Sequence, residues 1–313
     1  MTPFFSIIIP VYNKEKFVKN TLDTVLNQTF QNYEVIVVND GSTDNSLEIL
    51  RSINDPRLRI FSQENQGAAA SRNKGMEKAT ASYVCFLDAD DSWKTDHLAV
   101  LAGAITKFPD AKMFCSRYVT QINHNTFIKN NFLDIADDYE GYVDDFFKSS
   151  YINRVALTSA VCIHKSVFEE LGGFNSTTCS TEDLEYWIKI ALAYKVVITA
   201  KTTMVYNFVT DNASLSKIHI TKKTVPDFDI YAGEELQNPS LKRFLDLYRV
   251  EYALQYKIAG DLQRSRALLQ KTDPKNINFK TKLLMGLPSA VLQKLLKIKH
   301  ILKSKGIDFS IYH

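Results

Sequence analysis

The residues best suited to chemistry in this sequence include two aspartates on a short acidic turn. Asp88–Asp91 reads Asp-Ala-Asp-Asp and directly follows the apolar run Tyr83–Leu87. Carboxylates on a tight turn are the hard oxygen ligands that Mg²⁺ or Mn²⁺ prefers, and such a metal commonly bridges to substrate phosphates. Acidic turns are also common as purely structural features. The position of Asp88 and Asp90 after an apolar run is what favours a metal site.

Residues that could bind a ligand follow three earlier apolar runs in the same way. They are Pro10, Val11, Tyr12 and Glu15 after the first run, Asp40 after the second, and Gly67 and Arg72 after the third. In a parallel α/β sheet the carboxyl ends of the strands form one edge, and ligands bind outside that edge. We therefore expect these residues to lie beside the acidic turn.

One more carboxylate, Asp183, comes at the start of a predicted helix, directly after Glu182. Acidic residues are favoured in the first turn of any helix, which is the structural alternative. A carboxylate held there can also accept the proton of an attacking hydroxyl group. Positive charge on the opposite side would stabilise an anionic leaving group. We interpret Asp183 as a candidate general base.

The elements that must position these residues are short apolar runs alternating with helical patterns, which predicts an α/β fold with a parallel sheet covered on both faces. The predicted strands are Ser6–Pro10, Glu34–Asn39, Leu58–Ser62, Tyr83–Leu87, Met113–Tyr118, Val155–His164, Val196–Ile198 and Met204–Val209. The predicted helices are Glu15–Gln28, Asn45–Ser52, Ala68–Ala79, Asp96–Lys107, Lys165–Leu171 and Thr181–Tyr194. The stretch Ile122–Tyr151 is interpreted as irregular.

The pattern changes near Pro226, so we predict two parts, residues 1–225 and residues 226–313. In the second part Tyr231–Leu269 and Leu283–Lys303 are expected to be helical. The segment from Lys271 to Lys305 holds nine lysines and one acid, a net charge of +8 against +3 for the whole chain. Its region Lys280–Lys305 mixes lysines with leucines and isoleucines, as do amphipathic helices on anionic membranes. Packing on the body or on a second subunit is the alternative.

Composition excludes several classes of protein. Hydrophobic residues make up 45% of the 313-residue chain and charged residues 23%, as in ordinary globular proteins. The body of the chain lacks the basic character of a nucleic-acid binder. The four cysteines are widely spaced, which favours buried free thiols over a zinc site. We expect no signal peptide and no membrane-spanning helix, and hence a cytoplasmic protein, peripheral to the inner face of the membrane.

Five groups of residues, taken in order, resemble the motifs of family 2 glycosyltransferases with the GT-A fold. They are Ile7–Asn13, Val37–Asp44, Asn65–Gly75, Phe86–Asp91 and Glu182 with Asp183. The resemblance spans roughly residues 4–210, whereas the last third is only loosely similar to the variable tails of bacterial surface-polysaccharide enzymes. It implies a Rossmann-like GT-A domain and an inverting, metal-dependent enzyme that uses a nucleotide-diphosphate sugar. The implied donor is a UDP-sugar, and the implied acceptor is a glycan or a lipid-linked molecule.

The resemblance also implies roles for individual residues. Pro10, Val11, Tyr12 and Glu15 would line the base and ribose pocket, Asp40 would hydrogen-bond the base, and Gly67 would let the backbone approach the donor. Arg72 would pair with a phosphate or with Asp88. Asp88 and Ala89 would contact the donor, Asp90 would bind Mn²⁺ or Mg²⁺, and Asp183 would be the general base.

Two other functions compete with this interpretation. A sugar nucleotidyltransferase would need a glycine-rich phosphate loop, but the first strand leads into Pro10–Asn13, which has no glycine. A non-catalytic nucleotide-sugar or membrane-binding protein on the same fold would need no general base, so the presence of both Asp90 and Asp183 argues against it. His164 and His219 are left open as metal or phosphate ligands.

Overall fold

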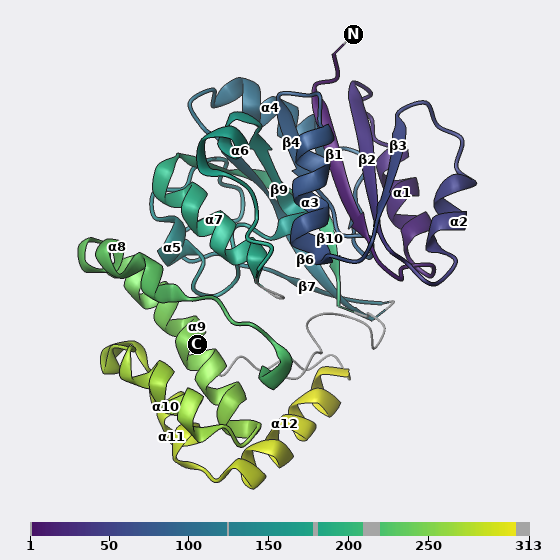
Figure 1. Ribbon diagram of the computed structural model, residues 1–313. Coiled ribbons are helices and arrows are strands. Elements are labelled where there is room, and N and C mark those ends of the chain that lie inside the picture. Colours follow the sequence, from purple (N-terminus) through teal and green to yellow (C-terminus); the bar gives the residue numbers. More distant parts are fainter. Residues whose placement is uncertain (1, 124, 178–180, 209–219, 305–313) are drawn as a thin grey trace.

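The computed structural model describes residues 2–123, 125–177, 181–208 and 220–304. Its strands form one sheet in the order β3-β2-β1-β4-β9-β6-β10-β5, and β7 and β8 pair with β6 and β10 (Figure 1). The strands are β1 (Phe5–Val11), β2 (Tyr33–Asp40), β3 (Leu58–Gln63), β4 (Tyr83–Phe86), β5 (Ser92–Trp93), β6 (Met113–Asn123), β7 (Thr126–Lys129), β8 (Gly141–Tyr142), β9 (Val161–His164) and β10 (Val196–Asn207). The helices are α1 (Val18–Leu26), α2 (Ser46–Arg51), α3 (Gly67–Lys78), α4 (His97–Lys107), α5 (Phe146–Ser149), α6 (Ser166–Leu171), α7 (Glu182–Ala193), α8 (Ala232–Gln237), α9 (Pro239–Ile258), α10 (Leu262–Gln270), α11 (Phe279–Gly286) and α12 (Ser289–Ser304).

The first four predicted strands are confirmed, and they are parallel to one another. Strand β1 pairs with β2 and β4, and β2 pairs with β3, so that Ile8 lies between Ile36 and Phe86. Every residue of β1 except Pro10 is buried. Successive side chains of a strand point to opposite faces, so this burial requires cover on both faces of the sheet. Because the strands are parallel, β1, β2 and β4 end at the same edge.

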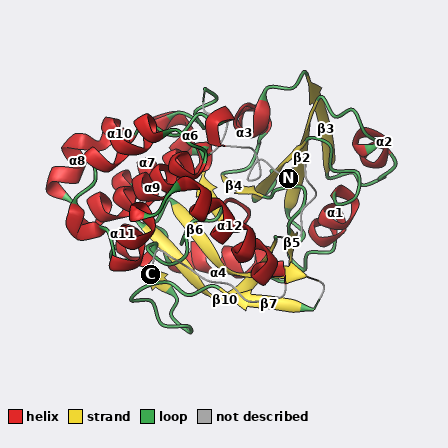
Figure 2. Cartoon of the chain, turned by 90° about the horizontal axis from the view of Figure 1, so that it is seen from below, coloured by secondary structure: helices red, strands yellow, loops and turns green. Residues whose placement is uncertain are grey.

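Helices α3 and α1 supply that cover from opposite faces of the parallel strands (Figure 2). Helix α3 packs closely on β1 and β2 because it has a glycine, Gly75, at its contact with β1. A Cβ atom placed on Gly75 would lie 2.4 Å from Cγ2 of Ile8. This contact sets how near α3, and therefore Arg72, comes to the sheet.

Beyond β4 the sheet is mixed, and two predicted strands need correction. Val155–His164 was expected to be one strand, but only Val161–His164 is, and Thr158–Ala160 is a 3₁₀ turn. Strand β9 is antiparallel to both β4 and β6. A buried loop and a buried strand share the same apolar pattern, so the sequence did not separate them. The turn places the hydroxyl of Ser159 2.5 Å from a carboxylate oxygen of Asp91.

A second correction concerns β10, which was expected as two short strands and is continuous over Val196–Asn207. Its parallel pairing with β6 shifts register between Ile198 and Met204, as at a β-bulge. The polar residues at the bulge resembled a break in the sequence pattern. The stretch 122–151, expected to be irregular, contains the end of β6, both short strands β7 and β8, and helix α5.

The C-terminal region is helical as predicted, but in more pieces. The expected helix Tyr231–Leu269 is interrupted at Asn238, which caps α9, and at Gly260, whose φ of +89° ends it. The expected helix Leu283–Lys303 divides at Pro288 into α11 and α12. These helices lie below the sheet in Figure 1. The division of the chain at residue 226 stays a prediction.

Two further expectations concern thiols and the membrane. Cys85, Cys115 and Cys162 are buried and free, as predicted, while Cys179 lies outside the described residues. Among the helices of the described residues, none combines the length and the apolar character needed to cross a bilayer.

Candidate functional site

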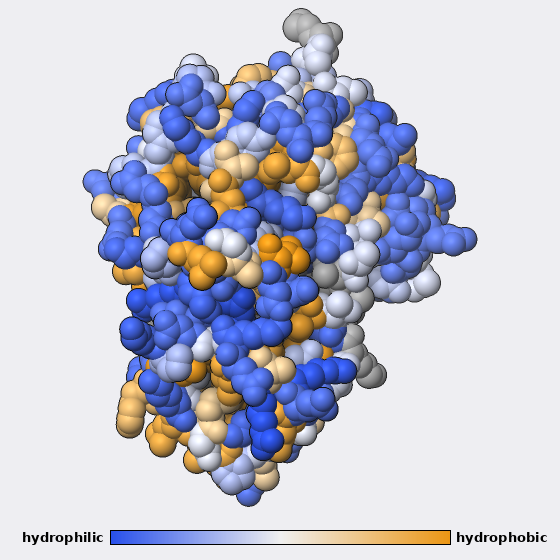
Figure 3. Space-filling view, turned by 60° about the vertical axis from the view of Figure 1, so that its left-hand side comes forward, coloured by the Kyte–Doolittle hydropathy of each residue, from blue (hydrophilic) through white to orange (hydrophobic). Residues whose placement is uncertain are grey.

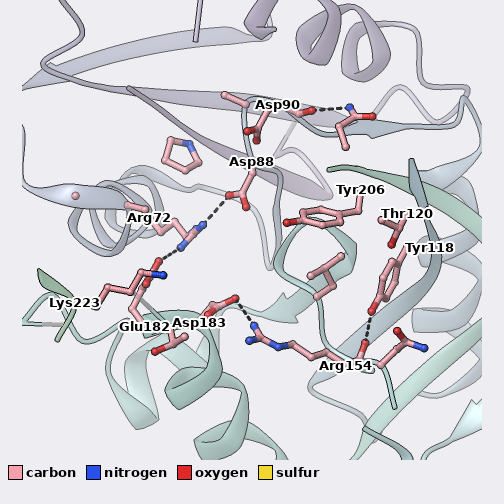
Figure 4. Close-up of a pocket in the computed structure, with 18 of the residues that line it drawn as sticks. Arg72, Asp88, Asp90, Tyr118, Thr120, Arg154, Glu182, Asp183, Tyr206 and Lys223 are labelled. Atoms are coloured by element: carbon pink, nitrogen blue, oxygen red, sulfur yellow. Dashed lines mark hydrogen bonds and ion pairs between the residues drawn. The ribbon is translucent and has the colours of Figure 1, made fainter. Parts of the chain in front are cut away.

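A cavity of about 910 Å³ opens at the carboxyl ends of β1, β2 and β4. Its other walls come from β6, residues 150–157, the start of α7, the end of β10, and α9. Figure 4 shows that labelled side chains from α3, the turn after β4, β6, the start of α7 and the end of β10 surround one space. The volume lies in the range of ligand pockets, and the position is where α/β sheets bind ligands.

Most of the residues singled out in the sequence lie in the wall of this cavity. They are Pro10, Val11, Tyr12, Asp40, Gly67, Arg72, Asp88, Ala89, Asp90 and Asp183. Glu15 lies outside the lining, because its carboxylate accepts hydrogen bonds from the backbone and side chain of Asn45 at 3.1 and 3.0 Å. It therefore holds the start of α2 next to the end of β1.

Asp40, at the end of β2, organises the loop that begins α3. One of its carboxylate oxygens accepts a hydrogen bond from the backbone N–H of Gly67 at 2.8 Å. The other accepts from the backbone of Gln66 at 3.0 Å and from the side chain of Gln63 at 2.8 Å. The peptide of Gly67, with φ of +88°, is fixed beside the cavity by these contacts.

Asp90 lies opposite a lysine that the sequence analysis did not single out. The ammonium nitrogen of Lys14 is 2.6 Å from Oδ2 of Asp90. Burial raises the pKa of the Asp90 carboxyl, and the negative charge of Asp88 adds to the rise, while Lys14 opposes it. The site thus keeps a cation next to this carboxylate.

The same residues bear on whether a divalent cation fits. The part of the chain that the structure describes has no cluster of three or more His, Cys, Asp and Glu side chains able to hold a metal. Carboxylates at positions 88 and 90 do suit Mg²⁺ or Mn²⁺ when a substrate diphosphate supplies further oxygen ligands. The site therefore fits a metal held jointly with a phosphate ligand.

Arg72 links the two halves of the site. Its guanidinium nitrogens are 2.7 Å from Asp88 and 2.7 Å from Glu182, and its side chain is only 5% exposed (Figure 4). Burial alone would lower the pKa of Arg72, but the two carboxylates outweigh it and raise the pKa. Burial raises the pKa of Glu182, although Arg72 opposes the change. Arg72 thus joins the end of β4 to the start of α7.

Asp183 is held at the cavity by a hydroxyl and a guanidinium group. Its Oδ2 accepts a hydrogen bond from Thr158 at 3.0 Å and lies 3.4 Å from Nη1 of Arg154. Its Oδ1 accepts from the backbone N–H of Leu184 at 2.8 Å. Thr181 precedes the helix with a left-handed φ of +71° and does not cap it with its side chain. The carboxylate of Asp183 therefore has a defined orientation at the cavity wall.

The last aspartate of the turn is structural. Asp91 is 1% exposed and accepts hydrogen bonds from Ser159 at 2.5 Å and from the backbone of Asn207 at 2.9 Å. Burial raises the pKa of its carboxyl well above the ordinary value. Asp91 joins the acidic turn to the end of β10.

The histidines left open by the sequence have different outcomes. His164 lies at the opposite end of β4 from the cavity, because β9 pairs antiparallel with β4 and places His164 beside Tyr83. There it contacts the hydroxyl of Ser166 at 2.9 Å. His219 lies outside the described residues.

Another part of the cavity wall was missed by sequence reasoning. It includes Tyr118, Thr120, Asn130, Tyr206 and Lys223, together with one face of α9: Phe244, Leu247, Tyr248, Glu251, Tyr252 and Gln255. These α9 positions follow the spacing of a single helix face. The spacing of Phe244, Tyr248 and Tyr252 was visible in the sequence, but nothing there indicated that this face turns toward the acidic turn.

Comparison with known proteins agrees with the resemblance stated above. The family described as Glycosyl transferase family 2 matches residues 6–171, just over half of the chain. An uncharacterized glycosyltransferase of Haemophilus influenzae is 48% identical over 99 residues, which is 31% of this chain and 40% of that protein. Hyaluronan synthase of Pasteurella multocida is 31% identical over 231 residues, 71% of this chain and 22% of the synthase. The chain thus spans well under half of either relative.

Solved structures that are similar in fold include those of TarS and PcManGT. S. aureus TarS 1-349 in complex with UDP-GlcNAc has a TM-score of 0.60 and 19% identity, over 84% of this chain and 72% of that one. The mannosyltransferase PcManGT from Pyrobaculum calidifontis, in complex with GDP-Man and Mn2+, has a TM-score of 0.51 and 18% identity, over 95% of this chain and 80% of that one. At these identities the likeness shows the shared fold of a central sheet flanked by helices.

Proposed function

We propose that this protein, which belongs to glycosyltransferase family 2, transfers a sugar from a nucleotide-diphosphate donor to an acceptor hydroxyl. In this proposal the transfer inverts the configuration of the anomeric carbon. The donor in this proposal is a UDP-sugar, and the product is part of a bacterial surface polysaccharide. The similar structures of TarS in complex with UDP-GlcNAc and of PcManGT in complex with GDP-Man support a nucleotide-sugar donor. The residues 1–225 would form the catalytic domain.

One observation carries the proposal: the strand-end residues and Asp183 line the same cavity. Pro10, Val11, Tyr12 and Asp40 would bind the base and ribose, and Gly67 would approach the donor. Asp88, Ala89 and Arg72 would hold the sugar diphosphate. Asp183 would take the proton of the acceptor hydroxyl as that oxygen attacks.

A divalent cation belongs to the proposal. Asp90 would hold Mn²⁺ or Mg²⁺ together with the donor diphosphate, and Lys14 would stay beside the same carboxylate or turn to the phosphates. When bound, the metal supplies positive charge that stabilises the departing diphosphate. Because the described residues offer few protein ligands, we expect the metal to bind tightly only when the nucleotide is present.

Calorimetric titration with UDP, with and without Mn²⁺, tests the donor site. We expect metal-dependent binding of UDP that is stronger than binding of GDP, and its loss in Asp90→Asn. Asp110→Asn is the matched control, because Asp110 is 73% exposed and lies 3.6 Å from Lys195, away from the cavity lining. Failure of every nucleotide to bind in the presence of metal would refute the enzymatic proposal and favour a non-catalytic protein.

The general base requires a separate variant. Asp183→Asn should bind UDP as the wild type does, yet lose transfer by about 10²- to 10⁴-fold, the range attributed to a positioned base. Equal transfer rates for the two proteins would exclude Asp183 as the base without affecting the donor site.

We further propose that helices α11 and α12 bring the enzyme to an anionic membrane, where a lipid-linked acceptor would be met. On α11, Phe279 and Leu283 are 81% and 60% exposed, while Thr281, on the other side of the helix, is buried. Lys280 and Lys282 lie between these two residues in the sequence, and helical spacing puts one lysine on each side of the apolar pair. An apolar row between lysines is typical of helices that lie in a membrane interface.

Helix α12 repeats this arrangement. Leu292 is buried against the body of the protein, while Leu295 and Ile298 are 41% and 51% exposed. Lys294 and Lys297 lie beside them, and residues 279–304 contain no acid. Hydrophobic residues are visible among hydrophilic ones on the lower part of the molecule, over the C-terminal helices, in Figure 3. Two copies joined through this face would place lysine against lysine, which favours an anionic lipid surface as the partner.

Sedimentation with vesicles tests this part. The full chain should bind phosphatidylglycerol-containing vesicles and not pure phosphatidylcholine, with binding that weakens as salt rises. The quadruple change of Lys280, Lys282, Lys294 and Lys297 to Gln should lower binding at least tenfold, since each lysine near such a surface adds about 1 kcal/mol. Lys19→Gln, an exposed change on α1, is the control. Equal binding by both variants would refute the membrane surface.

A further inference from the structure

Helix α9 comes from the C-terminal region, far in sequence from the strands that build the donor side, yet it forms a wall of the catalytic cavity. Its residues Tyr248 and Tyr252 are one helical turn apart and both line that wall. The matched family segment ends at residue 171, so α9 lies outside it. The contacts of these two tyrosines lead to Asp183 by two separate routes.

The first route runs through Arg154. The hydroxyl of Tyr248 accepts a hydrogen bond from Nε of Arg154 at 2.8 Å, and the Arg154 guanidinium carbon lies 5.4 Å from the centre of the Tyr248 ring. Nη1 of the same guanidinium lies 3.4 Å from Oδ2 of Asp183 (Figure 4). The hydroxyl of Tyr118 donates to the backbone carbonyl of Arg154 at 3.0 Å. Tyr248 thus orients the guanidinium group of Arg154, which contacts the Asp183 carboxylate.

The second route runs through the backbone that starts α7. The side chain of Tyr252 is hydrogen-bonded to that of Thr181, and Tyr252 is 5% exposed. Thr181 has φ of +71°, a conformation that a β-branched residue keeps only when its surroundings hold it there. The residue lies two positions before Asp183. In addition, the hydroxyl of Tyr231 donates to the backbone carbonyl of Glu185 at 3.2 Å.

We propose that α9 is a clamp on the catalytic base: Tyr248, through Arg154, orients the Asp183 carboxylate, and Tyr252, through Thr181, fixes the helix start that carries it. Tyr248, Tyr252 and Arg154 are positioning residues, and the C-terminal region is therefore part of the catalytic unit. The inference rests on the proposed role of Asp183. We expect a clamp of this kind to act on the chemical step, because the hydrogen bonds of Tyr248 and Tyr252 lead to Arg154 and Thr181 and not to Asp40, Asp88 or Asp90.

Hydroxyl deletions test the clamp without opening a cavity in the core. We expect Tyr248→Phe and Tyr252→Phe each to lower kcat about 5- to 10-fold, the size of one lost hydrogen bond. The KM for the donor and the calorimetric Kd for UDP with Mn²⁺ should stay within twofold of the wild type. Tyr256→Phe is the matched control, since Tyr256 is buried on α9 one turn further on but does not line the cavity. Its kcat should be unchanged.

A double-variant cycle separates positioning from a general structural effect. Arg154→Gln should lower kcat, and adding Tyr248→Phe to it should cause little further loss, because the route through Arg154 is already broken. Arg154→Lys should be more active than Arg154→Gln, since lysine keeps the positive charge, although it lacks the planar guanidinium group. Tyr252→Phe acts on the other route, so its loss should multiply with that of Arg154→Gln. Independent losses for Tyr248 and Arg154, or a Tyr248→Phe kcat within twofold of the wild type, would overturn the clamp.

Hydrogen exchange keeps the clamp and the enzymatic proposal distinguishable. Amides at residues 182–187 should exchange at least fivefold faster in Tyr252→Phe than in Tyr256→Phe, whether or not a donor sugar has been found. If the wild type turned over no nucleotide sugar while this difference appeared, the proposed function would fail, and only the hold of Tyr252 on the start of α7 would stand. If transfer depended on Asp183 while exchange and kcat were unchanged in the tyrosine variants, the clamp alone would fail.

Discussion

Removing Arg72 should destabilise the fold by an amount that depends on pH. In Arg72→Met the carboxylate of Glu182, which is 6% exposed, loses its partner at 2.7 Å. Breaking a buried ion pair from one side costs about 3–5 kcal/mol, because the remaining charge is left uncompensated. This is a large part of the 5–15 kcal/mol that stabilises an average protein. We therefore expect a clear fall in the free energy of unfolding at pH 8.

The pH dependence follows from the sign of the Glu182 shift. Burial raises the pKa of Glu182 above its ordinary 4.5, Asp183 adds to the rise, and Arg72 lowers it. Without Arg72 the native carboxyl holds its proton to still higher pH. At pH values above 4.5, Glu182 of the native protein then binds more protons than Glu182 of the unfolded chain. The free energy of unfolding therefore falls as the pH rises through this range. The loss caused by Arg72→Met should be smaller at pH 5 than at pH 8.

Urea unfolding at the two pH values measures both effects. Arg51→Met is the control, because Arg51 is 62% exposed and pairs with Glu48 at 3.3 Å on the surface. Exposed pairs of this kind contribute about 0–1 kcal/mol. A loss below about 1 kcal/mol for Arg72→Met, or the same loss at pH 5 and pH 8, would show that Arg72 does not compensate a buried carboxylate.

Three other predictions concern the core and the acidic turn. Burial lowers the pKa of His97 from 6.5 to about 3. The unfolded chain therefore binds a proton at this residue that the native chain does not, and the free energy of unfolding should fall by about 1.4 kcal/mol per pH unit below pH 6.5. Urea unfolding of His97→Gln should lack that slope. Gly75→Ala should lower the free energy of unfolding by about 1–3 kcal/mol, because its Cβ would meet Ile8 at 2.4 Å. In the control Gly103→Ala the new Cβ has nothing within 4 Å, so this change within a helix should raise the free energy of unfolding by about 0.5–1 kcal/mol. Lys14→Ala should strengthen Mn²⁺ binding measured without nucleotide, because the ammonium group no longer competes for its carboxylate 2.6 Å away; unchanged metal affinity in calorimetry would contradict this.

Much of the strand-end side of the cavity was predictable because it depends on local order along the chain. Apolar runs with few polar interruptions predict parallel strands, and parallel strands end at one edge. The side chains of Asp40, Arg72, Asp88 and Asp90 therefore had to meet once those strands formed. Glu15 follows the end of β1 closely in the sequence, but it does not line the cavity, since its side chain turns toward Asn45.

The opposite wall depended on tertiary structure. Whether Val155–Ala160 is a strand or a buried turn, and which face of α9 meets the cavity, are decided by packing between segments far apart in the chain. Tyr248 lies 94 residues from Arg154, and Glu182 lies 110 residues from Arg72. Periodicity determines that a helix has an apolar face, but it carries no information about what that face will contact. By itself the sequence determined the fold class and the strand-end residues, whereas only long-range packing decided how Asp183 is held, because contacts between distant segments leave no pattern in either segment alone.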